Sequence, residues 1–151
     1  MERLNIIIDT REQQPWAFGP DVDCSIGTLR TGDYAIQGDD HFAIERKSLD
    51  DFLGTIGSGW ERFKRELDRM DKAEFIAKII IVESDFIHTC FTIKNGQIVP
   101  PSHNHPCLAP AFIQKRIAEL SMMGVSVLFA ACPELAATLA MAIFRERNKQ
   151  L

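Results

Sequence analysis

Two acids and a lysine, Asp33, Glu45 and Lys47, stand close together in the sequence and could carry out one reaction. Carboxylates bind Mg²⁺ or Mn²⁺, and the bound metal neutralises the charge that builds on phosphate oxygens during hydrolysis. A neighbouring ammonium group can orient the attacking water or help to remove its proton. We therefore interpret these three residues as candidates for the metal-assisted hydrolysis of a phosphodiester bond.

A predicted β-hairpin would bring the three side chains together. Residues 33–36 and 42–46 alternate between apolar and polar positions, and a turn containing Gly and Asp separates the two runs. Side chains on a strand alternate between its faces, so Glu45 and Lys47 lie on the same face of the second run. Asp33 begins the first run and can therefore lie opposite them.

The composition fits one globular domain that spans residues 1–151. The chain has 151 residues, 46% of them hydrophobic and 25% charged, so it can bury a core but leaves no room for a second domain. Its net charge of −4 argues against a general polyanion binder, so contact with nucleic acid would need a local basic patch or a partner. No apolar run approaches the ~18 residues of a membrane span, and the charged N-terminus differs from a signal peptide. We expect a cytoplasmic protein with no membrane segment, associated with the nucleoid if its source is prokaryotic.

Apolar patterns predict alternating strands and helices around this hairpin. Further strands are expected at 4–8, 22–29, 75–82 and 125–130, and helices begin after Ser48 and Ser58 and at Pro110 and Pro133. The first strand ends in Asp9-Thr10-Arg11-Glu12, which places polar groups at a strand end. Strand, helix and strand in this order predict a parallel crossover and a mixed sheet, and therefore an α/β fold.

Two of the predicted helices have distinct apolar and polar sides. The helix after Ser58 has Trp60, Phe63, Leu67 and Met70 at helical spacing, and its other faces carry Arg62, Lys64, Arg65 and Arg69. These cations form a local basic patch that is either a solvated face or a set of phosphate contacts, for which Arg62 and Arg65 are the candidates, Arg62 the stronger. The closing helix, from Pro133 to about residue 148, carries Leu135, Leu139 and Ile143 on one side.

The segment 85–109 reads as an irregular insertion. Lys94-Asn95-Gly96-Gln97 could form the tip of a small hairpin. The segment also holds imidazole and thiol groups that could bind zinc, at His88, Cys90, His103, His105 and Cys107. The usual zinc-ligand spacings are absent, so zinc is the weaker of the two interpretations.

One motif in the chain resembles that of a known family. Gly32-Asp33, then Glu45-Arg46-Lys47, three residues and Asp51 resemble the nuclease motif of the XPF/Mus-type (ERCC4-domain) structure-specific endonucleases. The segment Asp9-Thr10-Arg11-Glu12 resembles the first-strand motif of that family. The resemblance covers residues 4–83 well and residues 110–147 as general architecture.

The resemblance implies a fold, an activity and partners. The implied fold is restriction-endonuclease-like, with a central mixed β-sheet between two layers of helices. The implied activity is cleavage of one strand of branched, flap or fork DNA during repair or recombination, with Mg²⁺ or Mn²⁺ as the cofactor. Members of the family usually form homodimers or heterodimers through the nuclease domain and carry a helix-hairpin-helix domain, which this sequence lacks.

The resemblance also implies roles for individual residues. Asp33 and Glu45 would bind the metal together with the backbone carbonyl of Arg46, and Asp9 would lie near it. Lys47 would serve the attacking water. Arg11 and Arg46 would hold phosphates or the site itself.

Simpler interpretations compete with the nuclease site. Ser48-Leu49-Asp50-Asp51 has the form of a capping box, which explains Asp51 without a catalytic role. Asp39 and Asp40 are interpreted as turn formers. A noncatalytic DNA-binding or heterodimer subunit could be built on the same fold, and so could a restriction-like or mobile-element enzyme. The presence of Asp33, Glu45 and Lys47 together favours an active nuclease.

Overall fold

The computed structural model describes residues 3–99, 105 and 108–151, and its main feature is a mixed six-stranded sheet in the order β2-β1-β3-β4-β5-β8. The strands are β1 (Leu4–Asp9), β2 (Val22–Gly27), β3 (Tyr34–Ile36), β4 (Ile44–Lys47), β5 (Lys78–Val82) and β8 (Val125–Phe129). The strand pairs β1–β2, β4–β5 and β5–β8 are parallel, whereas β3 is antiparallel to its two neighbours, β1 and β4. The predicted mixed sheet is therefore confirmed.

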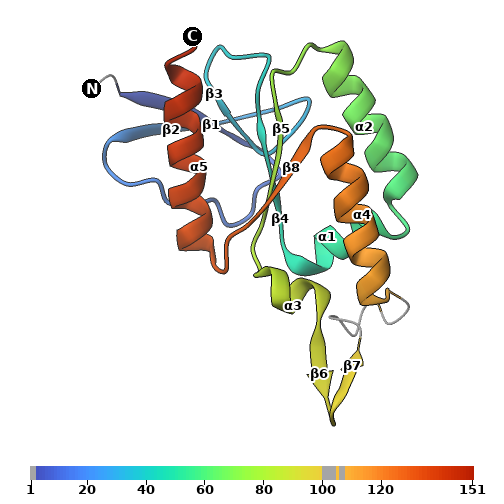
Figure 1. Cartoon of the computed structure of the whole chain (residues 1–151). Coiled ribbons are helices and arrows are strands. Elements are labelled where there is room, and N and C mark those ends of the chain that lie inside the picture. The colour runs from blue at the N-terminus through green and yellow to red at the C-terminus, as the bar shows by residue number, and fades with distance from the viewer. Residues whose placement is uncertain (1–2, 100–104, 106–107) are drawn as a thin grey trace.

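Helices cover both faces of this sheet, as predicted. They are α1 (Leu49–Ile56), α2 (Trp60–Lys72), α3 (Phe86–Cys90), α4 (Pro110–Met122) and α5 (Pro133–Asn148). Helix α5 lies on one side of the sheet, and α1, α2 and α4 lie on the other (Figure 1). None of the helices in the described part of the chain is long and apolar enough to cross a membrane.

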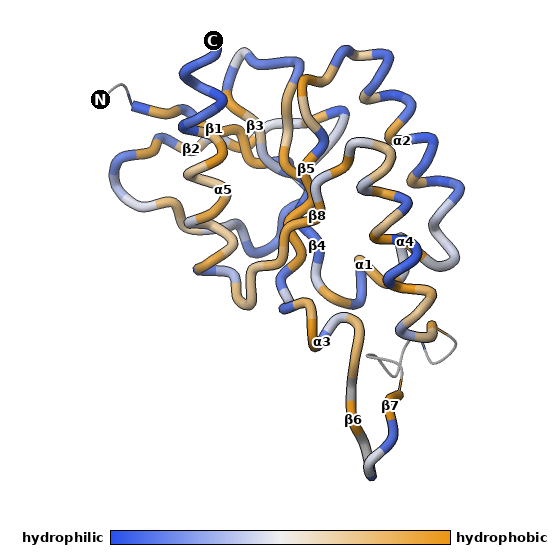
Figure 2. Tube along the Cα trace, viewed as in Figure 1, coloured by the Kyte–Doolittle hydropathy of each residue, from blue (hydrophilic) through white to orange (hydrophobic). Residues whose placement is uncertain are grey.

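Two hydrophobic clusters hold these layers together. One joins α5 to β1, β3 and β4 through residues such as Ile6, Ile44 and Phe144, and the other joins α1, α2 and α4 to β5 through residues such as Phe52 and Ile80. Hydrophobic residues run along the central strands and hydrophilic residues line the outer side of α2 (Figure 2). Burial of apolar area in both clusters is the main stabilising term for such a sheet.

The β3–β4 hairpin forms as the sequence predicts. Tyr34 pairs with Ile44, and the backbone N–H of Asp33 donates to the Ile44 carbonyl at 2.9 Å. Gly32 enters the hairpin with a φ of +80°, and a Cβ at this position would stand 2.6 Å from the Cβ of Ala43. Glycine is therefore required before Asp33 both for its backbone conformation and for its packing.

The two helices that follow the hairpin begin differently. Ser48 caps α1, since its Oγ accepts a 3.2 Å hydrogen bond from the backbone N–H of Asp51, as the capping box predicts. The next helix begins after Ser58, as predicted, but its N-cap residue is Gly59 and no side chain caps it. The connection between α1 and α2 is tight. The backbone N–H of Gly59 donates to the Gly54 carbonyl at 2.9 Å, and a Cβ at position 59 would lie only 3.0 Å from that carbonyl oxygen.

The segment after β5 is more regular than predicted. The five-residue helix α3 begins after Asp85, whose side chain accepts a 2.6 Å hydrogen bond from the backbone N–H of His88. The predicted small hairpin is confirmed as β6 (Thr92–Lys94) and β7 (Gln97–Val99), which project from the body of the molecule (Figure 1). Asn95 and Gly96 at its tip both have positive φ, as a two-residue hairpin turn requires.

The inner face of α5 agrees only in part with the predicted one, since Leu139 and Ile143 pack against the core but are only partly buried. The fully buried residues are Ala136, Ala140 and Phe144, whereas Leu135 is 56% exposed. Small alanine side chains let the helix axis approach the sheet closely, so the larger aliphatic residues are displaced to the sides of the contact.

Candidate active site

The hairpin places the two predicted metal-binding acids and the lysine together at the end of β4. The Nζ of Lys47 lies 3.2 Å from Oε1 of Glu45, so the two residues share one face of the strand. Oδ2 of Asp33 accepts a 2.7 Å hydrogen bond from the backbone N–H of Arg46. Its other oxygen, Oδ1, accepts no hydrogen bond from the described residues, which leaves it available to a cation.

Electrostatics link the two acids. Burial, and then the neighbouring charge of Glu45, raise the pKa of Asp33 to about 7. Burial also raises the pKa of Glu45, although the Lys47 ammonium opposes that shift. Two buried carboxylates that repel each other are destabilised as a pair unless a positive charge binds between them.

This donor set fits a hard divalent cation. Among the residues that the structure describes, no three His, Cys, Asp or Glu side chains gather into a metal site. Mg²⁺ usually needs only one or two carboxylates, because water and substrate phosphates supply its remaining oxygen ligands. Asp33 and Glu45 are therefore sufficient as the side-chain ligands of such a cation.

Asp9 is committed to the protein scaffold. Its carboxylate is fully buried and accepts hydrogen bonds from Arg11 Nε at 2.6 Å and from the backbone N–H of Leu29 at 2.9 Å. Burial alone would raise the pKa of Asp9, but these hydrogen bonds outweigh burial and hold it below its usual range. Asp9 thus fixes the loop after β2 beside the first strand, and it sits next to Asp33 through the 2.9 Å backbone bond from Asp9 N–H to the Asp33 carbonyl.

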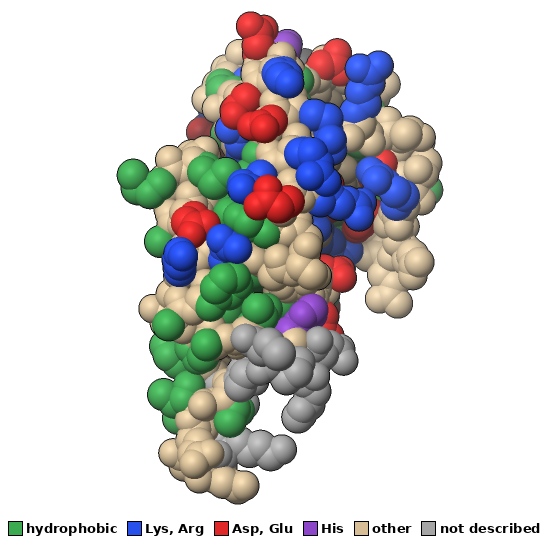
Figure 3. Space-filling view, turned by 90° about the vertical axis from the view of Figure 1, so that its right-hand side faces the viewer, with side chains coloured by type: hydrophobic (Ala, Val, Ile, Leu, Met, Phe, Trp, Pro, Cys, Tyr) green, Lys and Arg blue, Asp and Glu red, His purple; other side chains and the backbone are tan. Residues whose placement is uncertain are grey.

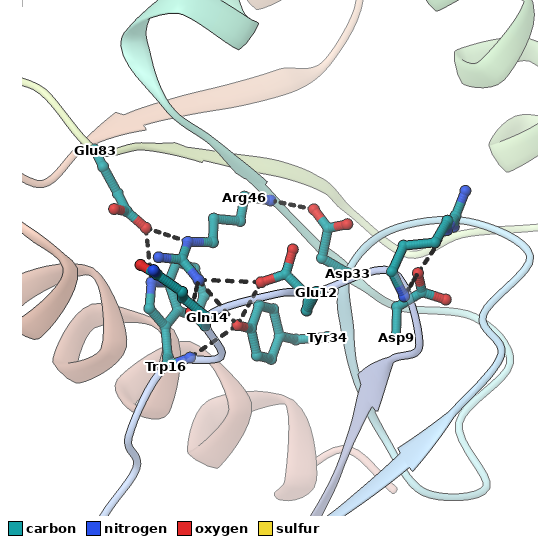
Figure 4. A network of polar contacts seen from close by, with 9 residues as sticks. Asp9, Glu12, Gln14, Trp16, Asp33, Tyr34, Arg46 and Glu83 are labelled. Carbon is teal, nitrogen blue, oxygen red and sulfur yellow. Dashed lines mark hydrogen bonds and ion pairs between the residues drawn. The ribbon is translucent and has the colours of Figure 1, made fainter.

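The Arg46 side chain points away from Asp33 into a polar network (Figure 4). Its guanidinium pairs with Glu83 and lies 3.1 Å from Oε2 of Glu12. It also donates a 2.7 Å hydrogen bond to the Gln14 carbonyl and lies 5.1 Å from the centre of the Trp16 ring. Because only 16% of this side chain is exposed, it ties β4 to its neighbours and has little surface for contact with DNA.

Four residues of this network, Glu12, Trp16, Tyr34 and Glu83, were not among the predicted site residues, although Glu12 belongs to the polar strand end that the sequence analysis noted. Tyr34 OH donates a 2.7 Å hydrogen bond to Glu12, and Trp16 Nε1 donates a 2.8 Å hydrogen bond to Glu83. The Trp16 and Tyr34 rings stack with their centres 4.5 Å apart. One signal could have found the two acids: Glu12 and Glu83 each follow a buried strand, and polar residues at strand ends converge at one edge of a sheet.

The predicted cations on α2 border this site on one side. Arg62 is 82% exposed and lines a groove with Lys47, and its guanidinium lies 4.0 Å from Glu66. The side chains of Arg65 and Arg69 make no hydrogen bond or ion pair with the described residues. Lysine and arginine side chains gather over the face that carries this helix (Figure 3). Arg11 is 71% exposed and pairs with Asp9 at 2.6 Å.

The candidate zinc ligands are only partly covered by the structure. His88 is exposed and bound to Asp85, whereas Cys90 is fully buried in the core, where burial raises the pKa of its thiol. These two side chains therefore do not share a binding site. His105 lies in the groove beside Lys47, and His103 and Cys107 lie outside the described residues.

Comparisons with known proteins identify the family of this chain and agree with its fold. The sequence matches the ERCC4 domain over residues 8–142. The structure resembles XPF from Aeropyrum pernix, with a TM-score of 0.65, a sequence identity of 20% and 93% of this chain covered. It also resembles XPF from the same organism in complex with DNA, with a TM-score of 0.69, a sequence identity of 21% and 98% of this chain covered. This chain spans 64% and 66% of those two chains. No curated protein sequence matches it. The structural likenesses show the predicted restriction-endonuclease-like fold.

Proposed function

Since the chain belongs to the ERCC4 domain family, we propose that it is a metal-dependent endonuclease that cuts one strand of branched, flap or fork DNA. The observation that carries this proposal is the arrangement of Asp33, Glu45 and Lys47. The two acids are buried close enough to repel each other, and the Lys47 ammonium lies 3.2 Å from Glu45. This arrangement supports a site for a divalent cation and a phosphate.

Each residue of the site has a distinct task in this proposal. Asp33, Glu45 and the backbone carbonyl of Arg46 would hold Mg²⁺ or Mn²⁺, which when bound neutralises the charge that builds on the phosphate oxygens. The Arg46 N–H fixes one oxygen of Asp33 and so orients the carboxylate. Lys47, held beside Glu45, would orient the attacking water, and its positive charge would stabilise the hydroxide that forms when that water loses its proton.

The other polar residues keep this geometry rigid. Arg46 joins β4 to Glu12 and Glu83, and Asp9 fixes Arg11 and the loop at Leu29. Exposed Arg11, Arg62 and Arg65 are our candidates for contacts with DNA phosphates. Such contacts give affinity without sequence preference, which suits an enzyme that recognises DNA shape.

The substrate and the assembly are part of the proposal. Branched DNA is the substrate that the family suggests, and XPF from Aeropyrum pernix has been seen in complex with DNA. We propose a homodimer or a heterodimer, because a net charge of −4 leaves a single chain with little general attraction for a polyanion. A second subunit would supply additional DNA contacts.

The proposal is tested by incubating the protein with flap, fork, Holliday-junction and linear duplex DNA, with Mg²⁺, Mn²⁺ or EDTA. Metal-dependent cleavage of a branched substrate is expected, with loss of cleavage in Glu45→Gln. Lys47→Ala should slow cleavage while it leaves DNA binding largely intact. Cleavage that survives replacement of Asp33 or Glu45 by Ala would refute the assigned site. Tight binding of branched DNA without cleavage in any metal would instead support a noncatalytic subunit.

A further inference from the structure

A polar groove of about 520 Å³ opens beside Lys47, between α1 and α2. Its described lining includes Lys47, Asp51, Ser58, Arg62, Glu66 and His105. The groove therefore continues directly from the candidate active site. It also receives one residue, His105, from the segment that returns after the β6–β7 hairpin.

We propose that this groove is a subsite for the nucleotide next to the scissile phosphate, and that His105 is the residue that binds and positions this nucleotide. The inference rests on the proposed function, since it takes Lys47 to mark the place of the scissile phosphate. It assigns a substrate contact to a residue outside the motif shared with the XPF/Mus-type nucleases.

The glycine-rich corner between α1 and α2 makes room for the returning segment. A Cβ at Gly57 would lie 3.5 Å from Cδ2 of Leu108, and a Cβ at Gly54 would lie 3.7 Å from Cε1 of His105. Leu108 packs against the cluster beneath α1 and α2, and its backbone N–H donates to the His105 carbonyl at 3.2 Å. His105 thus lies beside α1, and its backbone carbonyl is bonded to Leu108, which packs in that cluster.

The imidazole of His105 has no partner within the described protein. Of the three described histidines, His88 binds Asp85 and His41 contacts the Ala73 carbonyl at 2.9 Å, but His105 makes no side-chain hydrogen bond with a described residue. A half-buried imidazole that faces a polar groove retains both a donor and an acceptor for a ligand.

The chemistry of the lining favours a nucleotide over a simple ion. Lys47, Arg62 and the Ser58 hydroxyl can donate hydrogen bonds to a phosphate or a sugar, whereas Asp51 and Glu66 can accept from a base or a hydroxyl group. The groove is also in the size range of small-molecule sites.

The inference is tested with wild type, His105→Ala, His105→Gln and the matched control His88→Ala, which removes an exposed histidine of the same segment. Affinity for flap DNA is measured by fluorescence anisotropy with Ca²⁺, and KM and kcat are measured with Mg²⁺. The same measurements are repeated on substrates with one abasic site at each position around the cleavage point.

Loss of one hydrogen bond to the nucleotide should raise Kd and KM about tenfold in His105→Ala while kcat changes little. His105→Gln should recover part of the affinity, and His88→Ala should match wild type. One abasic position should weaken wild type but add nothing to His105→Ala, because both changes remove the same contact. A structural defect would lower affinity equally at every position.

Two outcomes would overturn the inference: a His105→Ala affinity equal to that of His88→Ala, or abasic effects that add to His105→Ala at all positions. If wild type binds DNA but cleaves none, the proposed function fails while the anisotropy measurements still decide the role of His105. If wild type binds no DNA, the nucleotide subsite is refuted as well.

Discussion

The backbone N–H of Arg46 donates a 2.7 Å hydrogen bond to Oδ2 of Asp33, while the Arg46 side chain extends away toward Glu83. One residue therefore orients a candidate metal ligand with its backbone and braces the sheet with its guanidinium. The antiparallel pairing of β3 and β4 makes this possible, because it sets the start of one strand against the end of the other.

Asp33→Asn should abolish cleavage without harm to the fold. The amide oxygen of asparagine can still accept the hydrogen bond from Arg46, but the charge that would hold a cation is lost. Loss of several kcal/mol of transition-state stabilisation predicts a decrease in rate of roughly a thousandfold or more. Single-turnover cleavage of flap DNA measures this, with Asp40→Asn in the exposed hairpin turn as the control. A rate within tenfold of wild type would contradict the role of Asp33.

The same substitution should stabilise the metal-free protein at high pH. The pKa of Asp33 is about 7 in the fold, against 3.8 for an ordinary aspartate, so between these values the folded state binds more protons than the unfolded one. Stability should therefore fall as pH rises from about 4 to about 7, and the cost should be complete above pH 7. Asp33→Asn removes this cost, so the variant should have a free energy of unfolding about 1 to 3 kcal/mol higher than that of wild type at pH 8. This difference should vanish near pH 4.

Urea unfolding of both proteins across this pH range, in EDTA, measures the difference. Added Mg²⁺ should reduce the difference in stability between the variant and wild type, because a ligand that binds only folded wild type stabilises that protein alone. A wild type that gains stability between pH 4 and pH 7 relative to the variant would contradict the coupling of Asp33 to Glu45.

Arg46→Ala should destabilise the protein. The substitution leaves Glu12 and Glu83 half-buried without their cation, and loss of one member of a buried ion pair costs about 3 kcal/mol. Arg46→Lys should recover little of this stability, because an ammonium cannot replace the fork of donors that reaches Glu83, Glu12 and the Gln14 carbonyl. Equilibrium urea unfolding checks both variants. Wild-type stability in Arg46→Ala would show that the network is incidental.

Local sequence rules predicted much of the region around the site. The hairpin of residues 33–46, the cap at Ser48 and the shared face of Glu45 and Lys47 depend only on alternation and capping, which act between neighbours in the chain. The mixed sheet, which the alternation of strands and helices predicted, and the two helical layers, which the family resemblance implied, are also present. The positions of Asp33 and Glu45 follow from these local rules once β3 and β4 pair.

The features that the sequence did not predict depend on contacts between segments that are distant in the chain. The sequence pattern suggested that Arg46 holds phosphates or the site, but its partners Glu12, Trp16 and Glu83 come from two other segments. In the same way, Asp39 reads as a turn former, and nothing near it indicates that Arg147 would bind it. The inner face of α5 was predicted only in part for a related reason: the periodicity of large aliphatic residues found Leu139 and Ile143, but the centre of the contact with the sheet is made by Ala136, Ala140 and Phe144.

Arg147→Ala should reveal how the last helix holds the hairpin. Arg147 donates two hydrogen bonds to Asp39, at 2.7 and 2.9 Å, and the Asp39 side chain is only 1% exposed. Removal of the cation leaves a buried charge unpaired, which should cost about 3 kcal/mol. The pair lowers the pKa of Asp39 despite burial, so its contribution is present above the ordinary value of 3.8 and is lost as pH falls below it.

The variant Arg147→Ala should accordingly lose less stability on acidification than wild type does. Thermal unfolding from pH 3 to pH 7 measures both effects. The double variant Asp39→Ala/Arg147→Ala serves as the control, since removal of both partners leaves no buried charge and should recover part of the stability. Equal stability of the single and double variants would show that the charge of Asp39 is solvated.

Arg62→Ala and Arg65→Ala should each weaken DNA binding and lower its salt dependence. The two residues are three positions apart on α2, so their side chains are neighbours on one side of the helix, and Arg62 lines the groove that contains Lys47. Each phosphate contact that is lost should lower the slope of log K against log salt by about 0.9. Titrations of fork DNA at several salt concentrations measure the slope, with Lys115→Ala on α4 as the control for a general loss of charge. If all three variants bind with the same slope as wild type, α2 is a solvated face and the DNA lies elsewhere.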